Sequence, residues 1–261
     1  MSVVVGVVLA SLTVAVALFA PLLAVADPFA LSGPSLSPPT LAHPMGTDAL
    51  GRDVYSGVVY GARASLSIAL GAGVLALLVG TVVGTISGFW SGIASGALMR
   101  VTELFQVMPR FLLIVLTATL FGAGNVQLAC ILGLTAWPTL ARVTRAEILT
   151  LRESNFVLAA RAAGASSWRI LWRELMPSVI PTALIMLGLL FAQLLLVQAS
   201  LAFLGVSDPN TITWGALAAQ AQSYLRVAWW LPLFPGLAIT LGVLGFNLLS
   251  DAYARRFYRE R

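Results

Sequence analysis

The chain alternates long, charge-free apolar stretches with shorter segments that carry its charges. The apolar stretches cover residues 3–26, 64–90, 111–141, 177–204 and 231–249. A helix needs about 20 apolar residues to cross the ~30 Å hydrocarbon core of a bilayer. Four of the stretches fit one crossing each, so the pattern predicts membrane-spanning helices rather than a globular core.

The stretch 111–141 is too long for one straight span and too short for two. We therefore expect a hairpin at residues 122–125, with a third span beginning near Leu98 and a fourth running from Val126 to Arg145. This division keeps the arginine-bearing segments that flank the pair on one side of the membrane. The pattern predicts an all-α integral membrane protein with six transmembrane helices.

Composition excludes a soluble domain, because 59% of the residues are hydrophobic and only 10% are charged. Too few charges remain to cover a water-exposed surface. The first stretch has a rival interpretation as a secretory signal peptide, since residues 24–26 (Ala-Val-Ala) resemble a cleavage site. The segment before it lacks Lys and Arg, and the apolar run is about twice the usual length. We therefore interpret residues 3–26 as a retained first span.

The arginines predict the orientation of the six spans. All fifteen basic residues are arginine, and in this map only Arg52, Arg63 and Arg226 fall outside the cytoplasm. Positive charge is retained on the cytoplasmic side of short loops. Both termini are therefore expected on the cytoplasmic side of the membrane. Twelve arginines then lie inside: Arg100, Arg110, Arg142, Arg145, Arg152, Arg161, Arg169, Arg173, Arg255, Arg256, Arg259 and Arg261.

The longest polar interruption runs from Arg142 to Pro177 and has a helical apolar pattern on both sides of Gly164. Gly164 favours a left-handed helix end, Ser166 is a good N-cap for a new helix, and Pro177 is expected to stop it. The segment therefore predicts a helix over 152–163, a sharp corner at Gly164 and a second helix over 166–176.

This segment resembles the cytoplasmic signature loop of ABC-importer permeases, whose pattern is Glu-Ala-Ala, three residues, Gly, nine residues, Ile-x-Leu-Pro. The matching positions are Ala159, Ala160, Gly164 and Pro177. The chain departs from the pattern at Leu158, Glu174 and Met176. The peptide-transporting branch has a looser form of the motif, which fits closely at Arg152, Phe156, Val157, Ala159 to Ala163 and Gly164 to Ser166.

A second string, residues 43–66, resembles the shorter permease of the dipeptide, oligopeptide and nickel importers. The motif residues that we expect on the extracytoplasmic side are His43, Gly46, Thr47, Asp48, Gly51, Arg52 and Asp53. Met45 and Gly57 replace the Leu and Arg of that branch. A lone histidine beside a proline is a poor metal site, so we interpret His43 as a turn residue. Asp48, Arg52 and Asp53 are interpreted as a structural ion-pair knot rather than a catalytic cluster.

The resemblance implies the type I ABC importer permease fold in the bacterial plasma (inner) membrane. It divides the chain into a first helix with an extracytoplasmic segment (1–62), a permease domain (63–252) with a coupling loop at 146–177, and a basic cytoplasmic tail (253–261). It implies a second homologous permease, two ATPase subunits and an extracytoplasmic solute-binding protein as partners. The implied contacts to the ATPase are Arg152, Asn155, Phe156, Ala159, Ala160, Arg161, Ala163, Gly164, Ala165 and Ser166.

Polar residues within the spans are few. Gln193, Gln198 and Ser200 are candidates for the translocation path, although bridging between helices explains them equally well. Glu103 is interpreted as an interfacial partner for Arg100 or a neighbouring helix. Glycines at 73, 80, 84 and 88 place small residues on one helical face, which allows close helix packing. Residues 201–230 predict an outer loop with a re-entrant or surface helix, whose Trp229 and Trp230 are interpreted as interfacial anchors.

The chain carries no candidate chemistry of its own. It contains no lysine, so it has no Walker loop, and it shows no metal cluster or nucleophile triad. We expect a transport subunit without enzymatic activity that binds no cofactor and no nucleic acid, while partner subunits bind ATP and Mg²⁺. A self-sufficient secondary transporter or channel, or a membrane enzyme, is the alternative. The sequence leaves the cargo open among dipeptides, oligopeptides, nickel chelates and haem-like solutes.

Overall fold

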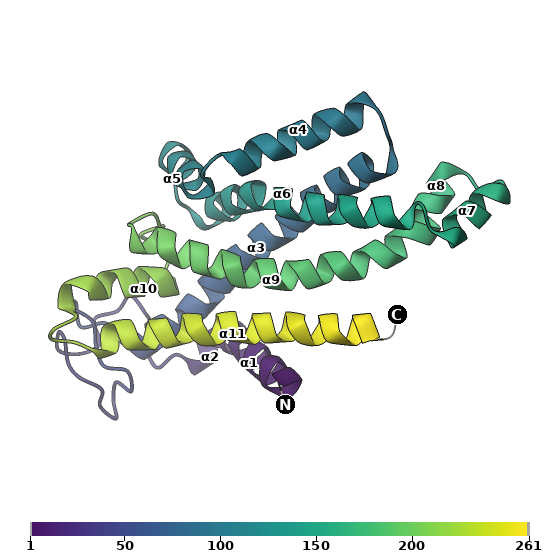
Figure 1. Ribbon diagram of the computed structural model, residues 1–261. Helices are drawn as coiled ribbons and strands as arrows, with labels where there is room; N and C mark the ends of the chain where they lie inside the picture. The colour runs from purple at the N-terminus through teal and green to yellow at the C-terminus, as the bar shows by residue number, and fades with distance from the viewer. Residues whose placement is uncertain (1, 260–261) are drawn as a thin grey trace.

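The computed structural model describes residues 2–259, which form a bundle of helices (Figure 1). Within this range the extended pairing is limited to isolated bridges, Leu31–Arg52 and Thr47–Asp53. The last two residues of the predicted basic tail lie outside the described residues. The helices are α1 (Ser2–Leu18), α2 (Ala20–Leu23), α3 (Val54–Phe89), α4 (Ile93–Val107), α5 (Arg110–Phe121), α6 (Asn125–Leu151), α7 (Asn155–Ala162), α8 (Ser167–Arg169), a π-helical turn (Ile170–Leu175), α9 (Met176–Phe203), α10 (Trp214–Gln220), a 3₁₀ turn (Ala221–Tyr224) and α11 (Trp230–Arg259).

The bundle contains four helices that are long and apolar enough to cross a membrane: α3, α6, the continuous helix Ser167–Phe203, and Trp230–Phe257 of α11. A fifth candidate is the pair α4 and α5, which is bent by 87° at its break. The apolar part of α1, Val3–Leu18, is shorter than these candidate spans. The prediction of a helical membrane protein is confirmed, with four or five candidate spans on length and composition.

Two predicted helix boundaries are wrong, and local chemistry explains both. The second span begins not at residue 64 but at Val54, because the Asp53 carboxylate accepts the Ser56 N–H at 2.7 Å and caps α3 there. As a result α3 runs through the predicted domain boundary at 62 and 63. Pro177 does not stop the helix that follows Gly164. It lies in the first turn of α9, where a missing N–H costs little, and the helix continues to Phe203.

The third predicted span is not one continuous helix. It breaks into α4 and α5 at Met108 and Pro109, where the residue before the proline is extended (φ −67°, ψ 132°). Arg110 is the first residue of α5 and therefore lies beyond the end of α4. The predicted pairing of Glu103 with Arg100 is confirmed, since Arg100 Nη1 lies 3.3 Å from Glu103 Oε2.

The long helices run along the length of the molecule, and its two ends differ (Figure 1). α7 and α8 project at one end, and the C-terminal end of α11 lies toward the same end. The irregular segment 24–53 and α10 lie at the opposite end. α1 packs along α11, and α9 packs against both α3 and α11. The two motif-bearing segments of the sequence are therefore separated by the length of the bundle.

The most extensive helix contact in the bundle is the seam between α3 and α6, where glycines of α3 meet the backbone of α6. A methyl group added at Gly80 would lie 2.9 Å from the Trp137 carbonyl oxygen, and one at Gly84 would lie 2.6 Å from Thr144 Cβ. One at Gly88 would lie 2.9 Å from Ile148 Cβ. The predicted role in helix packing is confirmed for these three glycines, whereas Gly73 faces Leu187 and Leu194 of α9 instead of α6.

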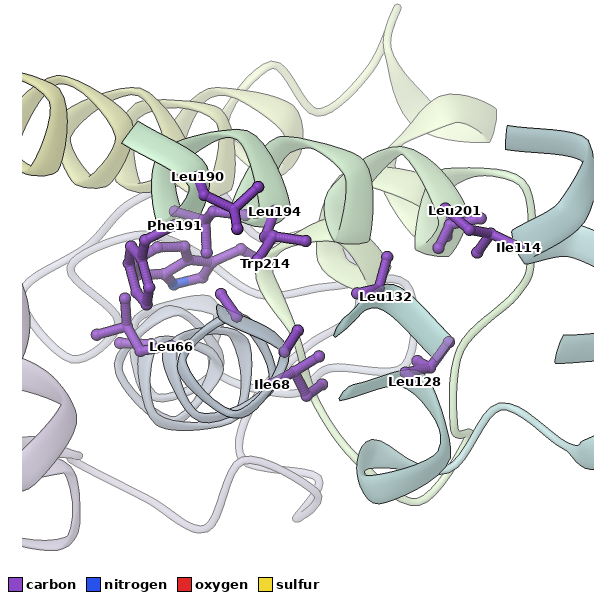
Figure 2. Packing of buried hydrophobic residues seen from close by; sticks show 14 of the residues in the cluster. Leu66, Ile68, Ile114, Leu128, Leu132, Leu190, Phe191, Leu194, Leu201 and Trp214 are labelled. Carbon is purple, nitrogen blue, oxygen red and sulfur yellow. The ribbon is translucent and has the colours of Figure 1, made fainter. Parts of the chain in front are cut away.

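The main apolar core lies where α3, α6 and α9 meet and is closed by Trp214 from α10 (Figure 2). The Trp214 ring sits between α9 and α3, beside Phe191 and Leu66. Its indole N–H donates to the Val58 carbonyl at 2.8 Å, so the one polar group of the buried ring has a hydrogen-bond partner. This ring therefore packs α10 against α3 and α9.

Two glycine-to-alanine variants test the α3–α6 seam. Gly84→Ala forces a methyl group against α6, and overpacking of this kind costs about 1–3 kcal/mol. Gly96→Ala on α4 is the matched control, because nothing lies within 4 Å of the added group. We expect Gly84→Ala to lower the midpoint of thermal unfolding in detergent and Gly96→Ala to leave it unchanged or raise it. Equal unfolding midpoints for the two variants would contradict close packing of α3 against α6 at Gly84.

Candidate functional site

The end of the bundle that carries α7 is built around a sharp corner. α7 ends in a Schellman motif: the Ala165 N–H donates to the Ala160 carbonyl at 3.0 Å and the Gly164 N–H to the Arg161 carbonyl at 2.9 Å. Gly164 has φ +81°, as the sequence predicted. The Ser166 hydroxyl oxygen then accepts the Arg169 N–H at 3.4 Å and caps α8. The helix, corner and second helix are confirmed, with α7 covering Asn155–Ala162.

A second, separate apolar core holds this corner on the bundle. It joins the end of α6, the inner face of α7 and the π-helical turn before α9. Val157 is the one α7 side chain that is fully buried, and Phe89 at the end of α3 packs against the cluster. The buried members are Ile148, Val157, Ile170, Leu171, Leu175, Met176 and Val179. This core spans three helix ends, so the corner is packed against all three.

Polar contacts tie the same region down. Arg152 Nη1 donates to the Gly88 carbonyl at 3.3 Å and so links the approach to α7 with the end of α3. The Thr182 hydroxyl donates to Glu147 Oε1 at 2.9 Å, which joins α9 to α6. These contacts lie on the inner side of the corner, so they fix its orientation without occupying its outer surface.

The predicted coupling residues divide into two groups. Arg152, Ala160 and Ala165 are partly buried, and the two alanines pack against the second core. The outward-facing members are Asn155, Phe156, Ala159, Arg161, Ala163, Gly164 and Ser166. Nothing lies within 4 Å of the position that a Gly164 side chain would take. The tip of the corner is therefore bare.

The outer surface of the corner is suited to docking. Phe156 and Leu158 of α7 and Trp168 of α8 expose large apolar side chains, with Phe156 43% and Trp168 63% accessible. A cavity of about 470 Å³ lies between α7 and the end of α3, lined by Phe89, Ser91, Arg152, Glu153, Leu158 and Arg161. Exposed apolar groups rimmed by charges are typical of surfaces that contact a protein or a membrane. The surface offers contacts but no group of acid, base and nucleophile.

At the opposite end, the segment 24–53 folds over the start of α3. His43 Nδ1 lies 3.0 Å from the buried Asp53 carboxylate, which also caps α3. The Gly46 N–H donates to the His43 carbonyl at 2.9 Å, so His43 is the turn residue that the sequence predicted. Gly46 has φ +75°, and an added side chain there would meet the Trp230 ring. This arrangement holds the segment against the top of α11.

The other motif residues form a hydrogen-bonded knot rather than the predicted ion-pair knot. Asp48 Oδ1 accepts the N–H groups of Leu50 and Arg52, each at 2.8 Å. The Arg52 guanidinium lies 5.7 Å from the centre of the Phe29 ring and makes no ion pair within residues 2–259. Thr47 is fully buried and accepts the Ser37 N–H at 2.9 Å. At Gly51 (φ +80°), an added side chain would collide with the Gly33 carbonyl.

The three candidates for the translocation path do not share one face of α9. Gln193 and Ser200 are exposed on one side, whereas Gln198 is 2% accessible and points into the bundle. The Gln198 amide oxygen has no hydrogen-bond partner within the described part of the chain. Gln198 therefore does not line an open path in this structure.

Two features escaped the sequence analysis. Trp230 is 4% accessible and donates to the Thr47 carbonyl at 3.1 Å, so it is a core residue and not an interfacial anchor, while Trp229 is 56% exposed. Trp214 clamps α10 to α3 through Ser65 and Val58. Burial by partners far along the chain decides both positions, and no local sequence signal reports that burial.

Comparison with protein families matches residues 76–261 to the binding-protein-dependent transport system inner membrane component family. A protein of Brucella suis biovar 1 (strain 1330), assigned as a peptide transport system permease, is 38% identical over 95% of this chain and 84% of its own length. The di/tripeptide transport system permease protein DppC of Pseudomonas aeruginosa (strain UCBPP-PA14) is 35% identical over 94% of this chain and 84% of its own length.

The fold is also that of a solved structure. A chain of the MetNI methionine ABC transporter, in inward-facing conformations, superposes with a TM-score of 0.63 at 19% identity, over 78% of this chain and 96% of its own. The family match, the relatives that align along most of the chain, and the apolar helices all indicate a membrane permease. The chain belongs to the family of inner-membrane components of binding-protein-dependent transport systems, the permease subunits of bacterial ABC importers.

Proposed function

We propose that this chain is the permease subunit of an ATP-driven importer and that the corner at Gly164 couples it to a partner ATPase. The observation that carries the proposal is the second apolar core, which makes the corner rigid with the ends of α3, α6 and α9 while leaving its tip bare. A lever transmits a domain motion only when its corner is fixed. Movement of a docked partner would thus tilt three helices together.

The proposed topology has six crossings with both termini in the cytoplasm. The bent pair of α4 and α5 forms the third crossing, and α1 with α2 forms the first. Residues 2–23 of these two helices would extend about 33 Å at 1.5 Å per residue, enough for the ~30 Å hydrocarbon core. The arginine asymmetry supports α7 on the cytoplasmic side and segment 24–53 on the outer side.

The proposed partners follow from what the chain lacks. It contains no lysine and therefore no Walker loop, so ATP and Mg²⁺ would be bound by two ATPase subunits docked on α7 and its counterpart. That counterpart belongs to a second, homologous permease, which would complete the path beside the exposed α9 face that bears Gln193 and Ser200. A solute-binding protein would deliver cargo at the end formed by segment 24–53 and α10.

The proposed cargo is a small peptide. Relatives that align along most of the chain are named for peptide, di/tripeptide and dipeptide transport, and one is named for glutathione, itself a tripeptide. Their shared chemistry is a short peptide backbone with charged ends. The Gln193 amide and the Ser200 hydroxyl on the exposed face of α9 suit the passage of such a polar solute.

Purification of the tagged chain from its native membrane in mild detergent tests the partner set. We expect two ATPase copies with Walker loops and one homologous permease in stoichiometric amounts, identified by mass spectrometry. Recovery alone, or as a homo-oligomer that still transports solute, would instead support a self-sufficient transporter.

Substitution at Gly164 tests the coupling role of the corner. Any side chain there bears a strain of roughly 1–2 kcal/mol at positive φ, so Gly164→Ala is the control for strain alone. Gly164→Leu adds a larger side chain at a position where nothing lies within 4 Å of the added Cβ. We expect both variants to assemble, but only Gly164→Leu to lose peptide uptake, by about tenfold, because overpacking a contact costs about 1–3 kcal/mol.

The measurement compares uptake with ATP hydrolysis in the reconstituted complex. Hydrolysis that persists in Gly164→Leu while uptake falls would identify uncoupling. Normal peptide uptake by the Gly164→Leu variant would contradict the coupling role of this corner.

A further inference from the structure

A cavity of about 400 Å³ opens between α4 and α6, away from the corner and from the α9 face. It is lined chiefly by Met99, Thr102, Glu103, Arg142, Arg145 and Leu149. The two arginines lie on α6, and the glutamate lies on α4. None of these residues belongs to the coupling surface or to the motif at the other end.

The charges around this cavity are not balanced. Glu103 lies 3.3 Å from Arg100, and Arg142 donates to the Gln106 amide oxygen at 2.8 Å. Arg145 makes no ion pair within residues 2–259, and its buried Nε has no hydrogen-bond partner there. Three arginines against one glutamate leave two net positive charges, and a buried donor without a partner is costly. The side chains around the cavity therefore favour an anionic ligand.

The helix α4, which lines one side of the cavity, carries exposed apolar side chains on its other faces. The adjoining α4 exposes Val101, Leu104 and Val107, the last with 83% of its surface accessible. Arg142 and Arg145 lie in the last turns of α6, shortly before α7. In the topology of the proposed function, on which this step rests, that level is the cytoplasmic headgroup region. A phospholipid whose phosphate is held at this level would have its acyl chains beside α4.

We propose that this cavity binds the phosphate of an anionic phospholipid from the cytoplasmic leaflet, held by Arg145 and Arg142. Arginine presents several N–H donors in a fork that matches phosphate oxygens. Basic pockets between helices on the cytoplasmic side bind lipid headgroups in this way. The lipid would fill the gap between α4 and α6 and so support the bent α4–α5 pair from outside.

Native mass spectrometry of the purified complex, titrated with phosphatidylglycerol, phosphatidylcholine or inorganic phosphate, tests the proposal. We expect phosphatidylglycerol to be retained in preference to phosphatidylcholine. Arg145→Gln should lower that retention about fivefold, the weight of one arginine at an anionic membrane surface. Arg173→Gln is the matched control, because it removes an exposed arginine elsewhere on the same side.

Two further variants separate binding from misfolding. Arg142→Gln changes an exposed side chain and should lower retention without affecting assembly. Arg145→Lys keeps the charge and should retain more lipid than Arg145→Gln. Equal retention of the two lipids, or an unchanged complex in Arg145→Gln, would overturn the proposal. Competition by inorganic phosphate at equal concentration would assign the cavity to a free anion and overturn the lipid. None of these readings depends on uptake or on ATP hydrolysis.

Discussion

The burial of seven apolar side chains between the ends of α6, α7 and α9 is the interaction on which this permease depends. Without it, α7 would be a short exposed helix, and helices of this length are marginal in water. With it, the Schellman turn at Gly164 has a fixed direction relative to the membrane bundle. The inward residues Ala160 and Ala165 belong to this core, so the signature motif encodes the mounting of the corner as well as its outer surface.

The rest of the bundle passes this rigidity on. The glycine seam joins α3 to α6 over several turns, and α3 reaches the second core through Phe89. The helix after Gly164 continues without a stop from Ser167 to Phe203, through a π-helical turn. A π turn inside a helix often accompanies function. Here it lies between the corner and the span that carries Gln193 and Ser200, so the helix that leaves the corner also carries this face of α9.

Local chemistry determined what could be predicted from the sequence. The corner at Gly164, the cap at Ser166 and the glycine face of α3 depend on residue type and short spacing, and all three were found. The bend at Pro109 was missed because the spans were placed by hydropathy alone, although a proline is itself a local signal for a helix break. The burial of Trp230 and Gln198, and the unpaired Arg145, depend on helices that meet far apart along the chain. Periodicity within one segment contains no information on those meetings.

The most direct test of the central claim is site-specific photo-cross-linking from position 163, beside the bare tip at Gly164, in native membranes. A photoreactive residue in place of Ala163 projects from the outer surface of the corner without entering the second core. The account predicts one dominant adduct, identified by mass spectrometry as an ATPase subunit with a Walker loop. Adducts only to lipid or to a second copy of this chain would contradict the coupling role of the corner.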